Sequence, residues 1–362
     1  MSLISWITLE PVTFFFTFGM SILGGAQVDT DLLLNKICVT ELNHDIEKCS
    51  NFTYIEDVNT EVQREANNFY MVAGWITRGF ALFYSLFAGS LADDFGYKPM
   101  ILAPVFSMVM CDIILLFNSI YIDHFPKEIF YLSDGWAFLG GNSVYLLGVY
   151  GYGTKISDPD SRATTLARYD GFEVLGRLAG TYFSPMVKNH FGAPFNYGLK
   201  MVSQFLVLVY VAFLVRESSE KKPSLPSCQN VLEWFQPLVD MFKAMTKVRP
   251  PNLNLILAIQ YILFAIYAFS FEEESMRYLY LQKAFEGFSG TDFAHLTMFI
   301  TAVNTIGLLV ILPVLSHKVN LHESTIQTMA IFVEMIGKLR ERSEPKNSVE
   351  KCKQTADILT IL

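Results

Sequence analysis

The sequence predicts an all-α, polytopic membrane protein. Of its 362 residues, 52% are hydrophobic and only 17% are charged, against roughly 25% charged residues in an average soluble domain. The apolar residues occur in blocks of about 20, the length of helix that crosses a hydrocarbon core about 30 Å thick. The same composition excludes a disordered chain and a nucleic-acid-binding protein.

Eight apolar blocks are interpreted as membrane-spanning helices. We expect the first to be a retained helix rather than a cleaved signal peptide, because no basic segment precedes it and Glu10-Pro11 sits where its apolar region would begin. The expected spans are approximately 7–24, 69–91, 100–117, 129–150, 172–187, 195–215, 253–271 and 293–315.

Basic residues indicate the orientation of these spans. Lys and Arg concentrate in alternate loops, and Lys98, Lys155 and Arg162 are among them. By the positive-inside rule these loops are cytoplasmic, and so is the N-terminus. Segment 25–68 is then an outer loop. It holds nine acidic and three basic residues, so it accounts for most of the net charge of −8.

The same outer segment carries two signs of an extracellular environment. Asn51-Phe52-Thr53 is a glycosylation sequon, so Asn51 is the expected glycosylation site. Cys38 and Cys49 lie on a side of the membrane where disulfides persist, and they are the candidate disulfide pair. The alternative is a chance sequon together with two free thiols.

Four regions follow from the composition. The first three are an N-terminal six-helix bundle with its glycosylated outer loop, a polar and proline-containing cytoplasmic linker, and the seventh and eighth helices. The fourth is a divergent, partly helical tail. Their boundaries are 1–215, 216–252, 253–323 and 324–362.

The segment 89–99, between the second and third spans, reads GSLADDFGYKP. Gly89 is expected to let two helices approach closely, Asp93 to cap a helix end or pair with a base, and Gly96 to permit a tight turn. The segment resembles the signature of the major facilitator superfamily between helices two and three. The resemblance implies a bundle of two six-helix halves and transport by alternating access. The matching residues are Gly89, Leu91, Ala92, Asp93, Phe95, Gly96, Lys98 and Pro99, while Asp94 and Tyr97 replace basic residues.

A narrower resemblance is to solute carrier family 46, the group of the proton-coupled folate transporter and its relatives. It rests on Glu10-Pro11, on the first outer loop with its cysteines and sequon, and on the segment 161–164, which reads SRAT. The resemblance implies that Asp170 matches a carboxylate that the folate branch uses in proton coupling. Lys155 and Ser270 replace an acid and a histidine of that branch, so neither proton coupling nor folate is carried over.

The second half of such a bundle is expected to be incomplete. After the eighth span, 325–339 is too short for a further span, and 340–352 is strongly charged. We expect a truncated product, such as an alternative transcript or an incorrect gene model. The alternative is a short form with eight spans.

Four ionisable residues inside predicted spans are the candidate site. Each costs about 2.5–3.5 kcal/mol at the bilayer centre, so each requires a role. Asp170, Glu173 and Arg177 share one face of the fifth span, and Arg78 lies near the middle of the second. One interpretation is a wet cavity in which the arginines hold an anionic group while Asp170 or Glu173 exchanges a proton. The other is an internal Glu173–Arg177 salt bridge that only orders the bundle.

Other polar and aromatic residues receive plainer assignments. Asp112 is expected to pack against a neighbouring helix, and the tyrosines of the fourth span, Tyr150 among them, are not assigned to a site. A cluster after the seventh span forms either an outer gate or a solvated helix end, and it comprises Glu272, Glu273, Glu274 and Arg277.

These observations predict a multi-pass transporter of a small organic solute, with an anion favoured and proton coupling open. No enzyme motif stands out, and we expect no cofactor, no metal and no nucleic-acid partner. The expected partners are the solute, protons and the lipid bilayer, in the plasma membrane rather than the lysosomal membrane. The alternative function is a truncated, non-transporting membrane protein that acts through interaction or has no activity.

Overall fold

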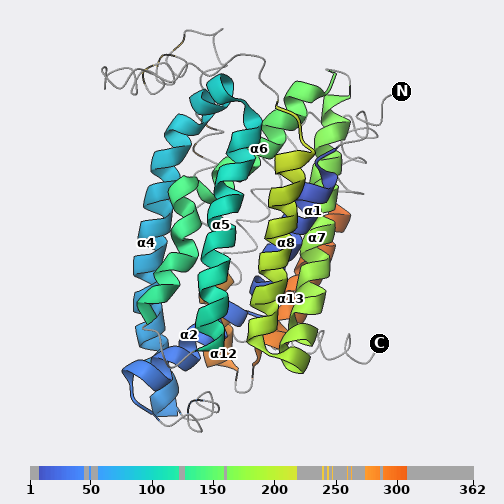
Figure 1. Ribbon diagram of the computed structural model, residues 1–362. Helices are drawn as coiled ribbons and strands as arrows, with labels where there is room; N and C mark the ends of the chain where they lie inside the picture. The colour runs from blue at the N-terminus through green and yellow to red at the C-terminus, as the bar shows by residue number, and fades with distance from the viewer. Residues whose placement is uncertain are drawn as a thin grey trace.

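In the computed structural model, every regular element among the described residues is helical (Figure 1). The structure describes residues 8–44, 49, 56–121, 127–158, 161–217, 239, 243, 247, 259, 262, 274–285 and 288–307. The long helices run side by side, which is how an all-α domain buries the apolar faces of its helices. The all-α prediction is therefore confirmed for this part of the chain.

Most of these helices coincide with a predicted span or extend one. In chain order the helices are α1 (Glu10–Gly24), α2 (Val28–Lys36), the π-helical turn η2 (Ile37–Glu41), α4 (Glu56–Phe95), α5 (Tyr97–Ile120), the 3₁₀ helix η4 (Lys127–Leu139), α6 (Gly141–Ile156), α7 (Arg162–Phe191), α8 (Ala193–Phe213), α12 (Glu274–Ala284) and α13 (Gly290–Ile306).

Three described helical segments are long and apolar enough to cross a membrane. They are Glu10–Glu41, Tyr97–Ile120 and Ala193–Phe213, and they overlap the first, third and sixth predicted spans. A helix of at least 18 residues with this hydropathy satisfies its own backbone hydrogen bonds inside lipid. These segments therefore allow the chain to associate with a membrane.

The structure gathers the predicted outer loops at one end of the bundle and the predicted inner loops at the other. At the first end, Lys127 and Glu41 form an ion pair of 3.1 Å. At the second end, Arg168 and Glu10 form an ion pair of 2.6 Å. We call these the outer end and the inner end.

The predicted outer loop 25–68 is largely helical, which corrects the sequence-based prediction. It contains α2, η2 and the first turns of α4. Asp29 and Asp31 occupy the first turn of α2 and Lys36 its last turn, where each charge favours the helix dipole. Leu33 and Leu34 of α2 are also fully buried, so packing supports this polar helix.

The fourth predicted span is not one continuous helix. It is divided at Gly140 into η4 and α6, and Gly140 has a φ of +93°. A residue with a side chain is strained in that conformation. A Cβ there would also lie within 3 Å of the Tyr84 ring on α4, so the break lets α6 approach α4 closely.

Small residues bring α1 and α7 into close contact. A Cβ at Gly176 would lie 2.3 Å from the Phe14 carbonyl oxygen, and a Cβ at Gly180 would lie 2.6 Å from the Phe18 carbonyl oxygen. The two glycines are four residues apart and therefore share one face of α7. Such small-residue faces let helix backbones pack directly inside a membrane.

A buried ion pair joins α5 to α8. The Lys200 ammonium lies 2.7 Å from the Asp112 carboxylate, and the two side chains are only 11% and 1% exposed. The expectation that Asp112 packs against a neighbouring helix is confirmed, and its neighbour is a lysine that the sequence analysis did not single out.

Several predictions lie outside the described residues. These are the glycosylation of Asn51, nearly all of the linker 216–252 and of the seventh span 253–271, the residue Ser270, and the whole tail 324–362.

The disulfide prediction is confirmed. Cys38 and Cys49 are bonded to each other, with their Cα atoms 5.7 Å apart. The bond ties η2 to the segment that precedes α4.

The disulfide predicts a simple thiol count. The chain has five cysteines, so a bulky maleimide added to denatured protein should modify three without reductant and five after reduction. Stepwise mobility shifts on a gel measure this number. Five modifications without reductant, in protein taken from an oxidising environment, would mean that this bond does not form.

Candidate functional site

A tyrosine on α6 bridges two carboxylates on α7. The Tyr150 hydroxyl donates to the Asp170 carboxylate, and it also lies 3.3 Å from Oε2 of Glu173. Asp170 and Glu173 face α6 together because they are three residues apart on one helix. The structure therefore brings together two of the predicted site residues and adds a third.

Glu173 is held on its other sides as well. Its Oε1 accepts a hydrogen bond of 3.0 Å from Nη2 of Arg177, one turn further along α7. Its backbone carbonyl accepts a hydrogen bond of 2.9 Å from the Thr17 hydroxyl on α1. The Glu173 side chain is 21% exposed and that of Arg177 is 43% exposed. The cluster therefore has a partly buried carboxylate and a partly exposed guanidinium.

This arrangement has the chemistry to take up and release a proton. A phenol hydroxyl has one hydrogen to donate, and an ionised carboxylate can only accept. Both contacts of Tyr150 are satisfied together when one carboxyl carries a proton and donates it to the phenol oxygen, while the phenol donates to the other carboxyl. With both carboxyls ionised, the single phenol hydrogen can serve only one of the two contacts at a time.

Arg78 does not belong to this cluster. It is exposed on α4, and its guanidinium lies over Gly74 of the same helix. α4 packs mainly against η4 and α6, and Figure 1 shows α4 and α7 on opposite sides of the bundle. The structure therefore gives no support to the prediction that Arg78 and Arg177 line one cavity, because their helices lie on opposite sides of the described bundle.

The segment 89–99 forms a sharper turn than expected. Gly89, Asp93 and Asp94 all belong to α4, and α5 starts directly after Gly96. Gly96 has a φ of +88°, which confirms the predicted tight turn. Lys98 donates a hydrogen bond of 2.8 Å to the Ala212 carbonyl at the end of α8.

One expectation for this segment is not met among the described residues. Nothing in them lies within 4 Å of a Cβ placed on Gly89, so it mediates no close contact with a described helix. Close contact occurs instead at Tyr97, whose ring lies 2.1 Å from a Cβ placed on Gly151 of α6 and under the Lys155 ammonium. Tyr97, which replaces a basic residue of the signature, thus packs against α6.

The predicted gate cluster is only partly described. Glu272 and Glu273 lie outside the described residues, while Glu274 begins α12 and Arg277 is half-buried in it. The neighbouring Tyr278 is 1% exposed. It donates a hydrogen bond of 2.6 Å to Asp31 of α2.

A cavity of about 270 Å³ lies between α7 and α13. Its walls include His190 of α7 and His295 of α13. A cavity of this size is close to the lower limit for sites that hold small organic molecules. Among the described residues, no three His, Cys, Asp or Glu side chains form a group that could hold a metal ion.

No protein-family model and no curated protein matches this chain. The resemblance to the major facilitator superfamily and to solute carrier family 46 therefore rests on the motifs of the sequence alone.

Sequence reasoning missed Tyr150, Lys200 and Tyr278. Each acts through a partner on another helix: Asp170, Asp112 and Asp31. Spacing along one helix reveals partners on that helix, as it did for Glu173 and Arg177. A buried ionisable residue in an apolar span signals that some partner exists, but it does not say which helix supplies it.

Proposed function

We propose that this chain is a membrane transporter of a small organic anion, with the major facilitator type of bundle and alternating access. The single observation that carries the proposal is the cluster of Tyr150, Asp170, Glu173 and Arg177 at the contact between α6 and α7. A cluster that only ordered the bundle would not need to leave the Arg177 side chain 43% exposed.

The proposed roles follow from the contacts. Arg177 binds the anionic group of the solute, because a guanidinium presents paired donors to a carboxylate. Binding of an anion draws Arg177 away from Glu173, whose Oε1 then loses the hydrogen bond from the guanidinium. The Tyr150 hydroxyl carries a proton between Asp170 and Glu173. Solute and proton would then bind to the same cluster, as a symporter requires.

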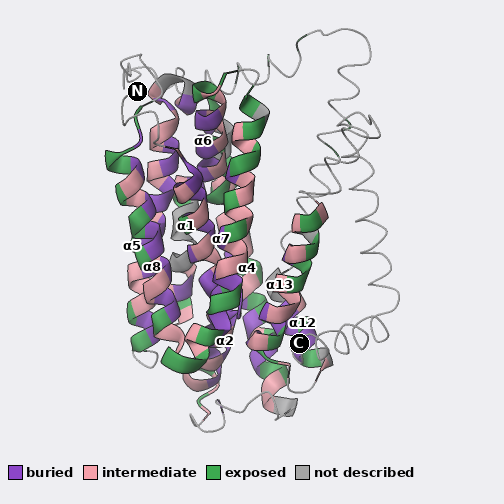
Figure 2. Ribbon diagram, turned by 90° about the vertical axis from the view of Figure 1, so that its right-hand side faces the viewer, coloured by how far each residue is buried: buried purple, intermediate pink, exposed green. Residues whose placement is uncertain are grey.

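The surface of the bundle supports a location in lipid. Large apolar side chains are exposed on several helices, and they include Trp75 (78% exposed), Leu82 (65%) and Phe213 (82%). Figure 2 shows exposed residues along the outward sides of the helices from one end to the other. A soluble monomer does not expose so much apolar surface, whereas lipid-facing helices do.

Uptake into vesicles tests this function. Protein reconstituted in liposomes should take up one or more labelled aliphatic or aromatic carboxylates, with saturation and with faster uptake at acidic external pH. Arg177→Ala should reduce uptake at least tenfold, because a charge-assisted hydrogen bond is worth about 1.5–3 kcal/mol. Arg64→Ala, at an exposed arginine of the outer end, is the matched control. Equal uptake by Arg177→Ala would remove this residue from the site.

A further inference from the structure

Polar contacts at the outer end converge on α2. Asp29 accepts a hydrogen bond from Tyr197 of α8, and Thr30 accepts one of 3.1 Å from Tyr70 of α4. Asp31 pairs with Lys188 of α7 through one carboxylate oxygen, and its other oxygen accepts the bond from Tyr278 of α12. The short helix α2 is thus the point where four other helices meet.

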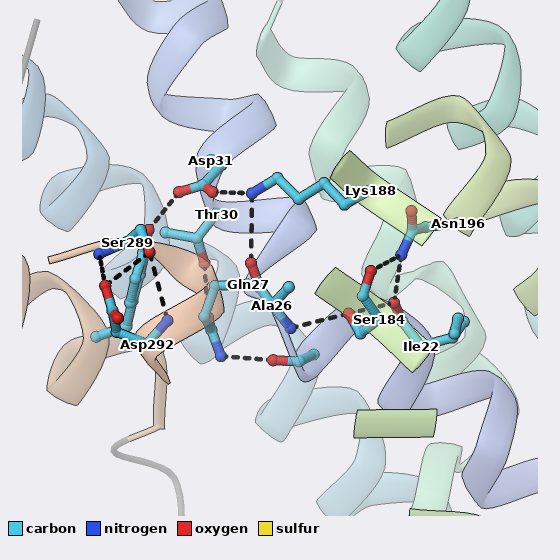
Figure 3. Close-up of polar contacts among 12 residues, drawn as sticks. Ile22, Ala26, Gln27, Thr30, Asp31, Ser184, Lys188, Asn196, Ser289 and Asp292 are labelled. Carbon is cyan, nitrogen blue, oxygen red and sulfur yellow. Dashed lines mark hydrogen bonds and ion pairs between the residues drawn. The ribbon is translucent and has the colours of Figure 1, made fainter. Parts of the chain in front are cut away.

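The corner between α1 and α2 is fixed by buried hydrogen bonds (Figure 3). The Ala26 amide donates to the Ser184 hydroxyl at 2.9 Å, and that hydroxyl donates to the Ile22 carbonyl at 2.8 Å. Asn196 donates to the same Ile22 carbonyl at 2.9 Å. These bonds come from α7 and α8, so hydrogen bonds join α1, α2, α7 and α8 into one unit at the outer end.

Among the described residues after the linker, α13 packs along α7, and two contacts reach α1 and α2. The first is the bond between Tyr278 and Asp31. The second is Gly290, the first residue of α13, where a Cβ would lie only 2.2 Å from the Ala26 carbonyl oxygen. Ser289 and Asp292 cap α13 through hydrogen bonds of 2.9 and 2.7 Å, so its start is well defined.

We propose that Asp31, Lys188 and Tyr278 form an outer latch, which holds α12 and α13 against α2 and α7 and keeps the seam between α7 and α13 closed to the outer side. The inference rests on the proposed function, because it assumes that the two parts of the chain move apart during transport. It places the gate on Tyr278 rather than on the acidic cluster that precedes it.

The chemistry of the outer latch suits a contact that opens and closes. Asp31 has two carboxylate oxygens, and Lys188, from its own side of the seam, satisfies one of them. When Tyr278 leaves, the carboxylate therefore keeps an ion pair, and opening does not strand a buried charge. Burial beside Asp31 raises the pKa of the Tyr278 phenol well above its usual range, so this phenol stays a donor at physiological pH.

Ala294 of α13 is the position at which opening of the seam between α7 and α13 can be detected. Ala294 of α13 lines the cavity between α7 and α13, and it is 2% exposed. Figure 2 shows α12 and α13 beside the rest of the bundle at the end where α2 lies. Separation of α13 from α7 at this end would expose position 294 to the outer solution.

Thiol labelling tests the outer latch in the full-length chain. Ala294→Cys is placed in otherwise unaltered protein on intact cells, and a membrane-impermeant maleimide is added outside. In this parent the new thiol should react slowly. Adding Tyr278→Phe removes the hydrogen bond to Asp31, which is a bond to a charged group. Because the labelling rate follows the population of the open state, it should rise about tenfold.

A second variant opens the seam by another route. Gly290→Ala places a methyl group against the fixed Ala26 carbonyl and should raise labelling by a similar factor. Matched controls are Tyr280→Phe, an exposed tyrosine of α12, and Gly198→Ala, where a Cβ meets nothing within 4 Å. Both controls should label within about twofold of the parent, in line with their small expected structural effect.

The outcomes separate the outer latch from the proposed transport. The latch is overturned if Tyr278→Phe and Gly290→Ala label at the parent rate, or if the controls label as fast as they do. Gel filtration of each variant shows whether it is folded, and Gly290→Ala decides alone if Tyr278→Phe is not. Faster labelling in a protein that moves no solute would support the latch and reject the transport function.

Discussion

Removing one member of the buried Asp112–Lys200 pair is expected to destabilise the protein by about 3–5 kcal/mol, because the remaining charge is left without its partner. Both side chains are almost completely buried between α5 and α8. Asp112→Leu alone and Lys200→Met alone should therefore each lower the melting temperature strongly or reduce the yield of monodisperse protein. Fluorescence-detected gel filtration after heating measures both effects.

The double variant is expected to be more stable than either single variant. Asp112→Leu combined with Lys200→Met leaves no unpaired charge and replaces the pair by apolar groups of similar size, so most of the lost stability should return. Lys98→Met, which removes a lysine that donates to the Ala212 backbone carbonyl at an exposed site, controls for the general effect of losing a charge. A double variant whose loss of stability equals the sum of the two single losses would show that the two residues are not coupled.

The second large effect is expected at Tyr150. Tyr150→Phe removes the one hydrogen that Asp170 and Glu173 share, and it should lower kcat/KM for uptake by about 10–100-fold, as loss of a hydrogen bond to a charged group implies. Asp170→Asn should have an effect of similar size. Because the two side chains are in contact, the double variant should lose much less than the product of the two single effects.

Tyr210 provides the matched control for this experiment. Its hydroxyl donates a partly buried hydrogen bond of 2.9 Å to the Thr8 carbonyl at the inner end, so Tyr210→Phe also removes one phenol hydrogen bond, but one whose acceptor is a backbone carbonyl. It should retain uptake within a few-fold of the unaltered protein. Multiplicative losses from Tyr150→Phe and Asp170→Asn would contradict a shared proton.

The helices themselves were largely predictable from apolar runs. The third span, expected at 100–117, is α5 at Tyr97–Ile120, and the sixth, expected at 195–215, is α8 at Ala193–Phe213. Their ends are set by local signals that are visible in the sequence, such as Gly96 before α5 and Gly192 before α8. The disulfide was also predictable, because its two cysteines lie in one outer segment.

Contacts between helices were not predictable in the same way. α2 forms in a segment that looked like a polar loop, and its burial depends on tyrosines that arrive from α4, α8 and α12. The division at Gly140 depends on how closely α6 must approach α4. The contact between Tyr150 and α7 depends on how α6 and α7 are each oriented about their own axes. Hydrophobic spacing predicts which face of a helix is buried, but it does not predict a single hydrogen bond.

Counterflow in proteoliposomes tests the central claim most directly. Vesicles containing the folded protein are loaded with an unlabelled carboxylate from a panel of aliphatic and aromatic mono- and dicarboxylates, and the labelled form is added outside. If the chain is a transporter built around Tyr150, Asp170, Glu173 and Arg177, the label should accumulate transiently for at least one member of the panel, and Asp170→Asn should reduce its rate at least tenfold. No accumulation for any member above that of protein-free vesicles, with protein that is monodisperse and correctly disulfide-bonded, would contradict the transport function.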